Sequence, residues 1–208
     1  SGPITRTVED AALALNALAG YHPGDPYSID DETDFLTSVQ NSIEGKRIAY
    51  SLDFDVFPVE SEIKSVIDTQ VRAFEEAGAI VEPVTLGIKR SQQELSDLWC
   101  RLIIPRNIAT LEAASANGPD LLGEHRNDFP PEYLQWIEEG YQLSAVDFYK
   151  DQEIRTEIYD CIQQVFSKYD LLVTPTLACL PVDNADNGNT IGPTQINGEA
   201  VDPLIGWC

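Results

Sequence analysis

Residues 45–86 read GKRIAYSLDFDVFPVESEIKSVIDTQVRAFEEAGAIVEPVTL, and this stretch decides the fold class. The segment from Arg47 to Leu52 alternates weakly between apolar and polar residues, which is typical of a strand. Ser61 is placed to cap a helix whose apolar residues follow the i, i+3, i+4 spacing and which Gly78 ends. Residues Ile80 to Val84 predict a second strand. A strand–helix–strand unit with short links predicts two parallel strands, and therefore an α/β or α+β fold with a small sheet.

Outside this unit the sequence predicts further helices, a further strand and one tail. The helices are expected at residues 8–19 (capped by Thr7), 91–116, 132–139 and 144–168, and the strand at Leu171–Val173. The apolar run of that strand is continuous, which is typical of a buried strand. Pro105 predicts a kink or break in the second of these helices. Residues 182–198 are rich in Asn, Gly and Asp, so we expect them to be mobile.

The charge of the chain excludes several classes of partner. The chain has 208 residues, with 35 Asp and Glu against 13 Lys and Arg, so its net charge is −22. Binding to nucleic acid or to an anionic membrane needs clustered Lys and Arg, so we expect neither partner. The charge leaves two sources open, a salt-loving organism or an ordinary acidic cytosolic protein.

The sequence contains no local motif of catalysis or metal binding. GxSxG, HExxH, Walker and GxGxxG patterns are all absent. The four cysteines lack CxxC spacing, and His22 and His125 lie in loops. On composition and motif alone, the chain therefore shows no catalytic group and no metal site.

The N-terminal run GPITRTVEDAA, residues 2–12, resembles the segment that follows the catalytic core in amidase-signature hydrolases. Three later stretches agree with the same family in order, and the resemblance covers essentially the whole chain. They are Gly45-Lys46-Arg47-Ile48, the run from Tyr169 to Thr176, and Gly206-Trp207-Cys208. The implied fold is an α/β amidase-signature-type mixed sheet covered by helices, of which this chain is the part after the core. Because the chain begins at Ser1 without Met, we expect residues 1–208 to be a single partial domain, truncated at both ends.

The resemblance implies an amidase that cleaves the C–N bond of a small linear amide through an acyl-enzyme. In this family the catalytic groups are a Ser, a second Ser on a cis peptide, and a neutral Lys, all upstream of the Gly-Pro-Ile motif. None of them maps onto this chain, so we expect the isolated chain to be inactive. The family implies no metal or organic cofactor, a small amide as the binding partner, and a cytoplasmic location. A homodimer remains open.

Four residues are candidates for the substrate pocket. Thr176 and Leu177 follow the predicted buried strand, where α/β folds place ligands, so we expect them in the pocket wall. Trp99 and Ile103 share one helix face and could line the acyl side of the substrate. The alternative for this second pair is ordinary core packing.

Two alternatives to a stand-alone amidase remain. The A subunit of the tRNA-dependent amidotransferase shares the opening motif. Its middle segment usually resembles Tyr-Asp-Gly-Val-Arg-Tyr-Gly, and no such run occurs between Glu112 and Phe129. The second alternative is an acidic interaction module without catalysis.

Overall fold

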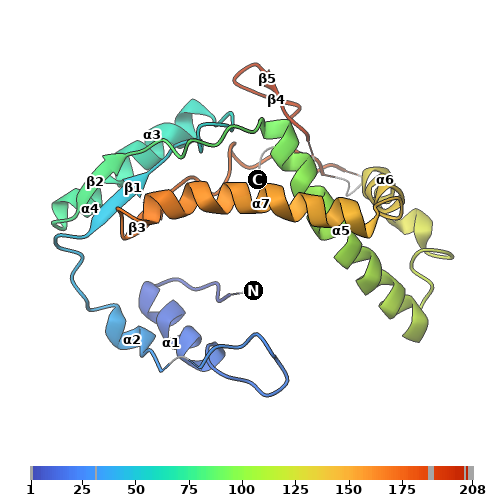
Figure 1. The fold of residues 1–208 in the computed structure, drawn as a ribbon, viewed down its shortest axis with the longest axis horizontal. Helices are drawn as coiled ribbons and strands as arrows, with labels where there is room; N and C mark the ends of the chain where they lie inside the picture. The colour runs from blue at the N-terminus through green and yellow to red at the C-terminus, as the bar shows by residue number, and fades with distance from the viewer. Residues whose placement is uncertain (1, 31, 187–189, 204, 206–208) are drawn as a thin grey trace. The chain divides into compact units, whose positions relative to one another are not determined.

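A computed structural model describes residues 2–30, 32–186, 190–203 and 205 of the chain. Their contacts form two compact units, residues 1–44 and residues 45–208 (Figure 1). The ending Gly206-Trp207-Cys208, which carried part of the resemblance, lies outside the described residues. A single partial domain over residues 1–208 stays a prediction.

The first unit contains two helices, α1 (Val8–Leu18) and α2 (Phe35–Ser38). The Thr7 hydroxyl accepts a hydrogen bond from a backbone N–H in the first turn of α1, which confirms the predicted cap. Asn16 joins the two helices. Its Nδ2 donates to Asp34 Oδ1 at 2.9 Å, and its Oδ1 accepts from the Phe35 N–H at 2.8 Å.

The second unit is built on a parallel sheet of order β2-β1-β3, with strands β1 (Arg47–Tyr50), β2 (Ile80–Pro83) and β3 (Leu171–Val173). The chain passes from β1 to β2 through α3 (Ser61–Gln70) and α4 (Arg72–Glu76). Ile48 of β1 lies opposite Val81 on one side and Leu171 on the other, in parallel register. The predicted strand–helix–strand unit is therefore confirmed. Ser61 is the first helical residue and not the cap, because Glu60 occupies the N-cap position.

The third strand is less buried than its continuous apolar run predicts. β3 lies at an edge of the sheet formed by the described residues, and Leu171 is 47% exposed. A run of this kind indicates burial on both faces, whereas an edge strand here is covered only in part. The α/β class itself is confirmed.

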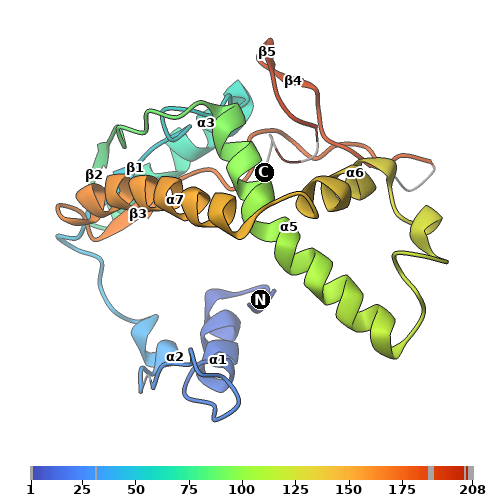
Figure 2. The same cartoon turned by 45° about the vertical axis from the view of Figure 1, so that its right-hand side comes forward.

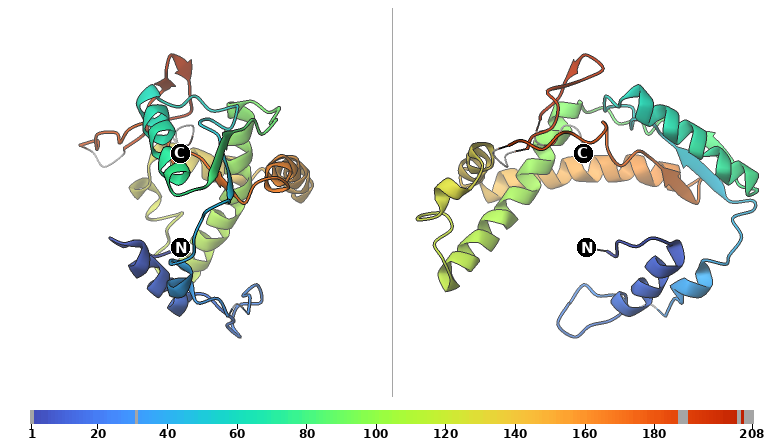
Figure 3. Two further views of the ribbon diagram at one scale, coloured as in Figure 1. Left: turned by 90° about the vertical axis from the view of Figure 1, so that its left-hand side faces the viewer. Right: turned by 180° about the vertical axis from the view of Figure 1, so that it is seen from behind.

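Helices cover both faces of the sheet (Figure 3). Successive side chains of a strand point to opposite faces. Ala49 of β1 and Leu172 of β3 pack toward α7 (Ala145–Phe166). Tyr50 points to the other face, where its hydroxyl lies 3.3 Å from a carboxylate oxygen of Asp68 in α3. The result is a helix–sheet–helix sandwich around the central strand β1.

Helices α5 (Gln92–Asn117) and α6 (Pro131–Gly140) pack together beside α7 (Figure 2). Ser91 caps α5, and the helix continues through Pro105 without the break that the sequence allowed. A proline removes one backbone hydrogen bond. The helical turn beside Pro105 is stabilised by packing against another helix, because Ile104 contacts Ile137 of α6. None of the helices in the described residues is long and apolar enough to cross a membrane.

The tail that the sequence predicts to be mobile, residues 182–198, ends in the turn of a hairpin. The hairpin pairs β4 (Gln195–Ile196) with β5 (Glu199–Ala200). Its turn is Asn197-Gly198, with φ angles of 52° and 83°. Two residues at positive φ are what a two-residue hairpin turn of type I′ requires. Ile196 is 2% exposed and packs in one cluster with Val59. The prediction of a mobile tail is therefore wrong for residues 195–198, which belong to this hairpin.

Candidate functional site

The carboxyl ends of the three parallel strands meet at one edge of the sheet, here called the carboxyl edge. Ser51, Val84 and Thr174 are the first residues beyond β1, β2 and β3. The Ser51 N–H donates to the Val173 carbonyl at 3.0 Å, and the Val84 N–H donates to the Tyr50 carbonyl at 2.9 Å. Strand pairing therefore continues to the edge and fixes where the three following loops begin. α/β folds bind ligands at this edge.

The loop after β1 is conformationally strained. Phe54 and Asp55 have φ angles of 54° and 65°, in the left-handed region that favours glycine. The Asp55 carboxylate accepts from the N–H groups of Leu86 at 2.6 Å and Gly87 at 2.9 Å, in the loop after β2. These bonds offset the strain and tie two loops of the carboxyl edge together. Strain of this kind clusters at functional sites.

The loop after β3 is fixed by Glu60. The Glu60 N–H donates to the Ala178 carbonyl at 2.8 Å, and Glu60 Oε2 accepts from the Leu180 N–H at 2.9 Å. This double attachment anchors the loop that contains Thr176 and Leu177. Both residues lie at the carboxyl edge and are exposed, Leu177 by 37%. Their role as pocket wall stays a prediction.

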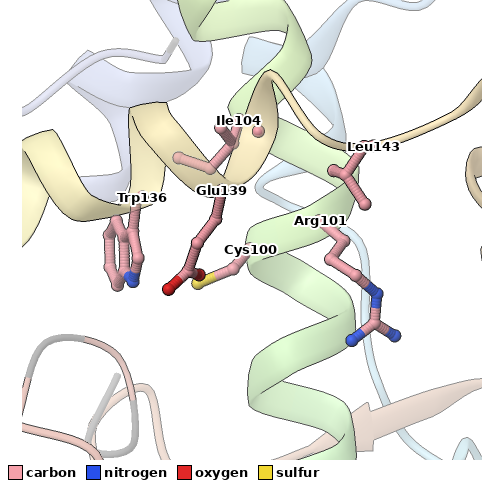
Figure 4. Close-up of a pocket in the computed structure, with 7 residues that line it drawn as sticks. Cys100, Arg101, Ile104, Trp136, Glu139 and Leu143 are labelled. Atoms are coloured by element: carbon pink, nitrogen blue, oxygen red, sulfur yellow. The ribbon is translucent and has the colours of Figure 1, made fainter.

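A hollow of about 110 Å³ lies between α5 and α6 and is here called the α5–α6 hollow (Figure 4). It is lined by Cys100, Arg101, Ile104, Trp136, Glu139, Gly140 and Leu143. Trp136 and Glu139 project from α6, and the Glu139 carboxylate lies beside the Cys100 thiol of α5. The walls are mostly apolar with few polar groups.

Cys100 is held as a neutral thiol. Burial, followed by the nearby carboxylates of Asp202, Asp97 and Glu139, raises its pKa from 9.0 to about 12. The thiolate is the nucleophilic form of cysteine. Cys100 is therefore an inert part of the wall and not a candidate nucleophile.

Arg101 forms a bidentate ion pair with Asp151 of α7. Its Nε and Nη2 donate to the two carboxylate oxygens, each at 2.9 Å. Asp151 is only 6% exposed, and this hydrogen-bonded pair raises the pKa of Arg101. The Arg101 guanidinium points away from Trp136 and Glu139 in Figure 4. Its charge is neutralised by Asp151, so it does not offer the hollow an anion site.

Trp99 and Ile103, the second pair of predicted pocket residues, lie beside the α5–α6 hollow and not in its lining. Trp99 is 49% exposed, and Ile103 is half-buried against the cluster of Ile104 and Ile137. Both sit one position before a lining residue of α5. No hydrogen bond joins this pair to Thr176 or Leu177 in the part of the chain that the structure describes. Their part in substrate binding stays a prediction.

The sequence interpretation missed the lining residues for one reason. It treated Gly140 as lying beyond the end of a helix, whereas Gly140 is the last residue of α6 and faces α5. A glycine inside a helical pattern can mark a close helix contact. Gly140 was therefore the available sequence signal for a close contact on α6, but not for the face of α5 that it meets.

The described residues contain no group of three or more His, Cys, Asp or Glu side chains suited to a metal ion. The two histidines make local contacts, His22 Nδ1 with the Gly24 N–H at 3.1 Å and His125 Nδ1 with Asp128 at 3.0 Å.

Known proteins resemble this chain along nearly its whole length. Residues 1–201 match the family described as Amidase. The crystal structure of a bacterial aryl acylamidase of the amidase signature enzymes matches with a TM-score of 0.95 and 48% identity, over 100% of this chain and 42% of that one. An amidase from Pseudomonas putida is 28% identical over 91% of this chain and 38% of its own length. The A subunit of the glutamyl-tRNA(Gln) amidotransferase from Halothermothrix orenii is 30% identical over 84% of this chain and 40% of its own length.

The chain thus spans about two fifths of the length of these relatives. The match to the acylamidase structure confirms the predicted fold over the entire chain.

Proposed function

This chain belongs to the amidase family, and on that premise we propose that its parent protein hydrolyses the C–N bond of a small amide. One observation carries the proposal, the 48% identity and TM-score of 0.95 to a bacterial aryl acylamidase across all of this chain. Aryl acylamides, whose amide nitrogen carries an aromatic ring, are therefore the first substrate class to test.

The proposed mechanism is acyl transfer. A Ser hydroxyl attacks the amide carbonyl, its proton passes through a bridging Ser on a cis peptide to a neutral Lys, and the amine leaves. Water then releases the carboxylate from the acyl-enzyme. These groups belong to the part of the family that precedes the Gly-Pro-Ile motif at Gly2, so residues 1–208 alone are proposed to be inactive. No metal or organic cofactor takes part in this scheme.

Within that mechanism this chain supplies binding surface. The carboxyl edge presents Thr176 and Leu177 on a loop that Glu60 anchors. The α5–α6 hollow adds an apolar recess. A cytoplasmic location and a homodimer stay predictions.

The test compares the full-length protein with residues 1–208 alone, using 4-nitroacetanilide and benzamide. We expect the full-length protein to release 4-nitroaniline or ammonia, and the shorter chain to release neither. Absence of turnover by the folded full-length protein with any member of an amide panel would overturn the proposal. Turnover by the shorter chain, after purification to constant specific activity, would overturn the proposed division of roles.

A second candidate is the A subunit of a tRNA-dependent amidotransferase, favoured by the 30% identity to that protein. Such a subunit would release ammonia from glutamine. We expect no glutaminase activity, because the identity to the aryl acylamidase is higher and covers the whole chain. Glutaminase activity without anilide turnover would favour the amidotransferase.

A further inference from the structure

The α5–α6 hollow offers space for at most one aromatic ring. Its volume is about 110 Å³. A dry protein cavity of roughly 150 Å³ lined by Leu, Ile and Phe binds benzene. Glu139 at its side is exposed, so the hollow can admit a ring from solvent and leave the attached group outside.

Its walls suit an aromatic ring. Trp136 offers the face or edge of an indole. Aromatic pairs in offset or edge-to-face contact stabilise a complex by more than the burial of their apolar area alone. Ile104 and Leu143 complete an apolar surface. Cys100 stays protonated and behaves as a small, polarisable hydrophobe.

The charges around the hollow select against anions. The carboxylates of Glu139, Asp97 and Asp202 all raise the pKa of the Cys100 thiol, whereas Arg101 lowers it by less, so negative charge dominates around the thiol. The cation in the lining is Arg101, and Asp151 already holds it through two hydrogen bonds. A ring that carried a carboxylate would meet repulsion without a compensating partner.

We propose that the α5–α6 hollow binds the aromatic ring of the amide substrate and that Glu139 makes it selective for neutral or cationic rings. This inference rests on the proposed function and names the substrate class of that site. Cys100, Ile104 and Trp136 form the ring pocket, and Glu139 is its specificity determinant.

Kinetics of the full-length protein provide the first test. Cys100→Phe fills the hollow, and we expect it to lower kcat/KM for 4-nitroacetanilide roughly tenfold or more, since lost apolar contacts typically change specificity by this amount. The value for acetamide, which has no ring, should stay within about twofold. Tyr159→Ala is the control, because Tyr159 is 59% exposed on α7 and should change neither value. Equal losses for both substrates, or no loss for either, would overturn the ring pocket.

Glu139→Gln tests selectivity without filling the hollow, so the proposal stays testable even if Cys100→Phe misfolds. We expect turnover of 4-acetamidobenzoate to rise severalfold relative to acetanilide. An unchanged ratio would overturn the role of Glu139.

Direct binding separates this inference from the proposed function. Fluorine NMR with 4-fluoroacetanilide should show binding to the full-length protein and loss of binding in Cys100→Phe. If binding is lost in this way but no amide is turned over, the pocket stands and the hydrolase proposal fails. If the protein turns over anilides and Cys100→Phe binds 4-fluoroacetanilide normally, the hydrolase stands and the pocket fails.

Discussion

Gly140 of α6 packs directly against Ile104 of α5. A Cβ atom at position 140 would collide with Cγ2 of Ile104 and lie 2.7 Å from Cδ1 of Ile108, closer than real Cβ contacts come. The two helices therefore reach this separation only because residue 140 has no side chain. The same contact forms part of the lining of the α5–α6 hollow.

Gly140→Ala should destabilise the protein. Overpacking a core contact typically costs about 1–3 kcal/mol, more than the gain of roughly 1 kcal/mol from helix propensity. Urea unfolding followed by circular dichroism measures the effect. Gly2→Ala is the control, because nothing lies within 4 Å of a Cβ there. Combining Gly140→Ala with Ile104→Ala should destabilise by less than the sum of the two, and full additivity would contradict the collision.

The sheet was predictable because its signals are local. β1, α3 and β2 lie within residues 45–86, and the apolar residues of each element have the spacing typical of a strand or of a helix. The hairpin at Asn197-Gly198 also carried a strong local turn signal. It was missed because the surrounding residues are polar, and the contact that buries Ile196 against Val59 comes from a distant part of the chain.

The site was only partly predictable. Thr176 and Leu177 could be placed at the carboxyl edge because a strand precedes them. The α5–α6 hollow depends on the contact of Gly140 with Ile104. The glycine can mark a close helix contact, but no local pattern identifies Ile104 as the partner. Helical spacing alone could not choose between the Trp99 face of α5 and the adjacent Cys100 face.

Asp151→Ala should destabilise the packing of α7 on α5. It leaves the Arg101 guanidinium without its bidentate partner in a half-buried setting, and removing one member of a buried pair costs about 3 kcal/mol. Arg101→Lys should be destabilising too, because an ammonium cannot make both bonds. Lys150→Ala is the control, since its pair with Asp147 is exposed and 3.7 Å long, and the loss should be about 0–1 kcal/mol. Equal unfolding midpoints for Asp151→Ala and Lys150→Ala would contradict this account.

Cys100 should resist alkylation in the folded protein. A thiol pKa raised to about 12 means that the neutral form persists as pH rises, so roughly 10⁻⁴ of Cys100 is thiolate at pH 8. Reactivity should increase only as pH approaches 12. Iodoacetamide labelling followed by peptide mass spectrometry measures the rate, with urea-unfolded protein as the reference. Labelling of Cys100 at the same rate in both states at pH 8 would show that the thiol is not shielded.

The link between α1 and α2 should survive to unusually low pH. Hydrogen bonds from Thr37 and Asn16 to Asp34, together with backbone N–H groups of α2, lower the pKa of Asp34 from 3.8 to about 2. A lowered pKa stabilises the folded unit above pH 3.8, and this contribution is lost as pH falls through about 2. Carbon NMR titration of the Asp34 carboxyl group measures the shift directly. Asn16→Ala should move the pKa back toward 3.8, whereas Asn41→Ala, an exposed change in the same unit, should leave it in place. An Asp34 that titrates near 3.8 in the unmodified protein would contradict the cap geometry.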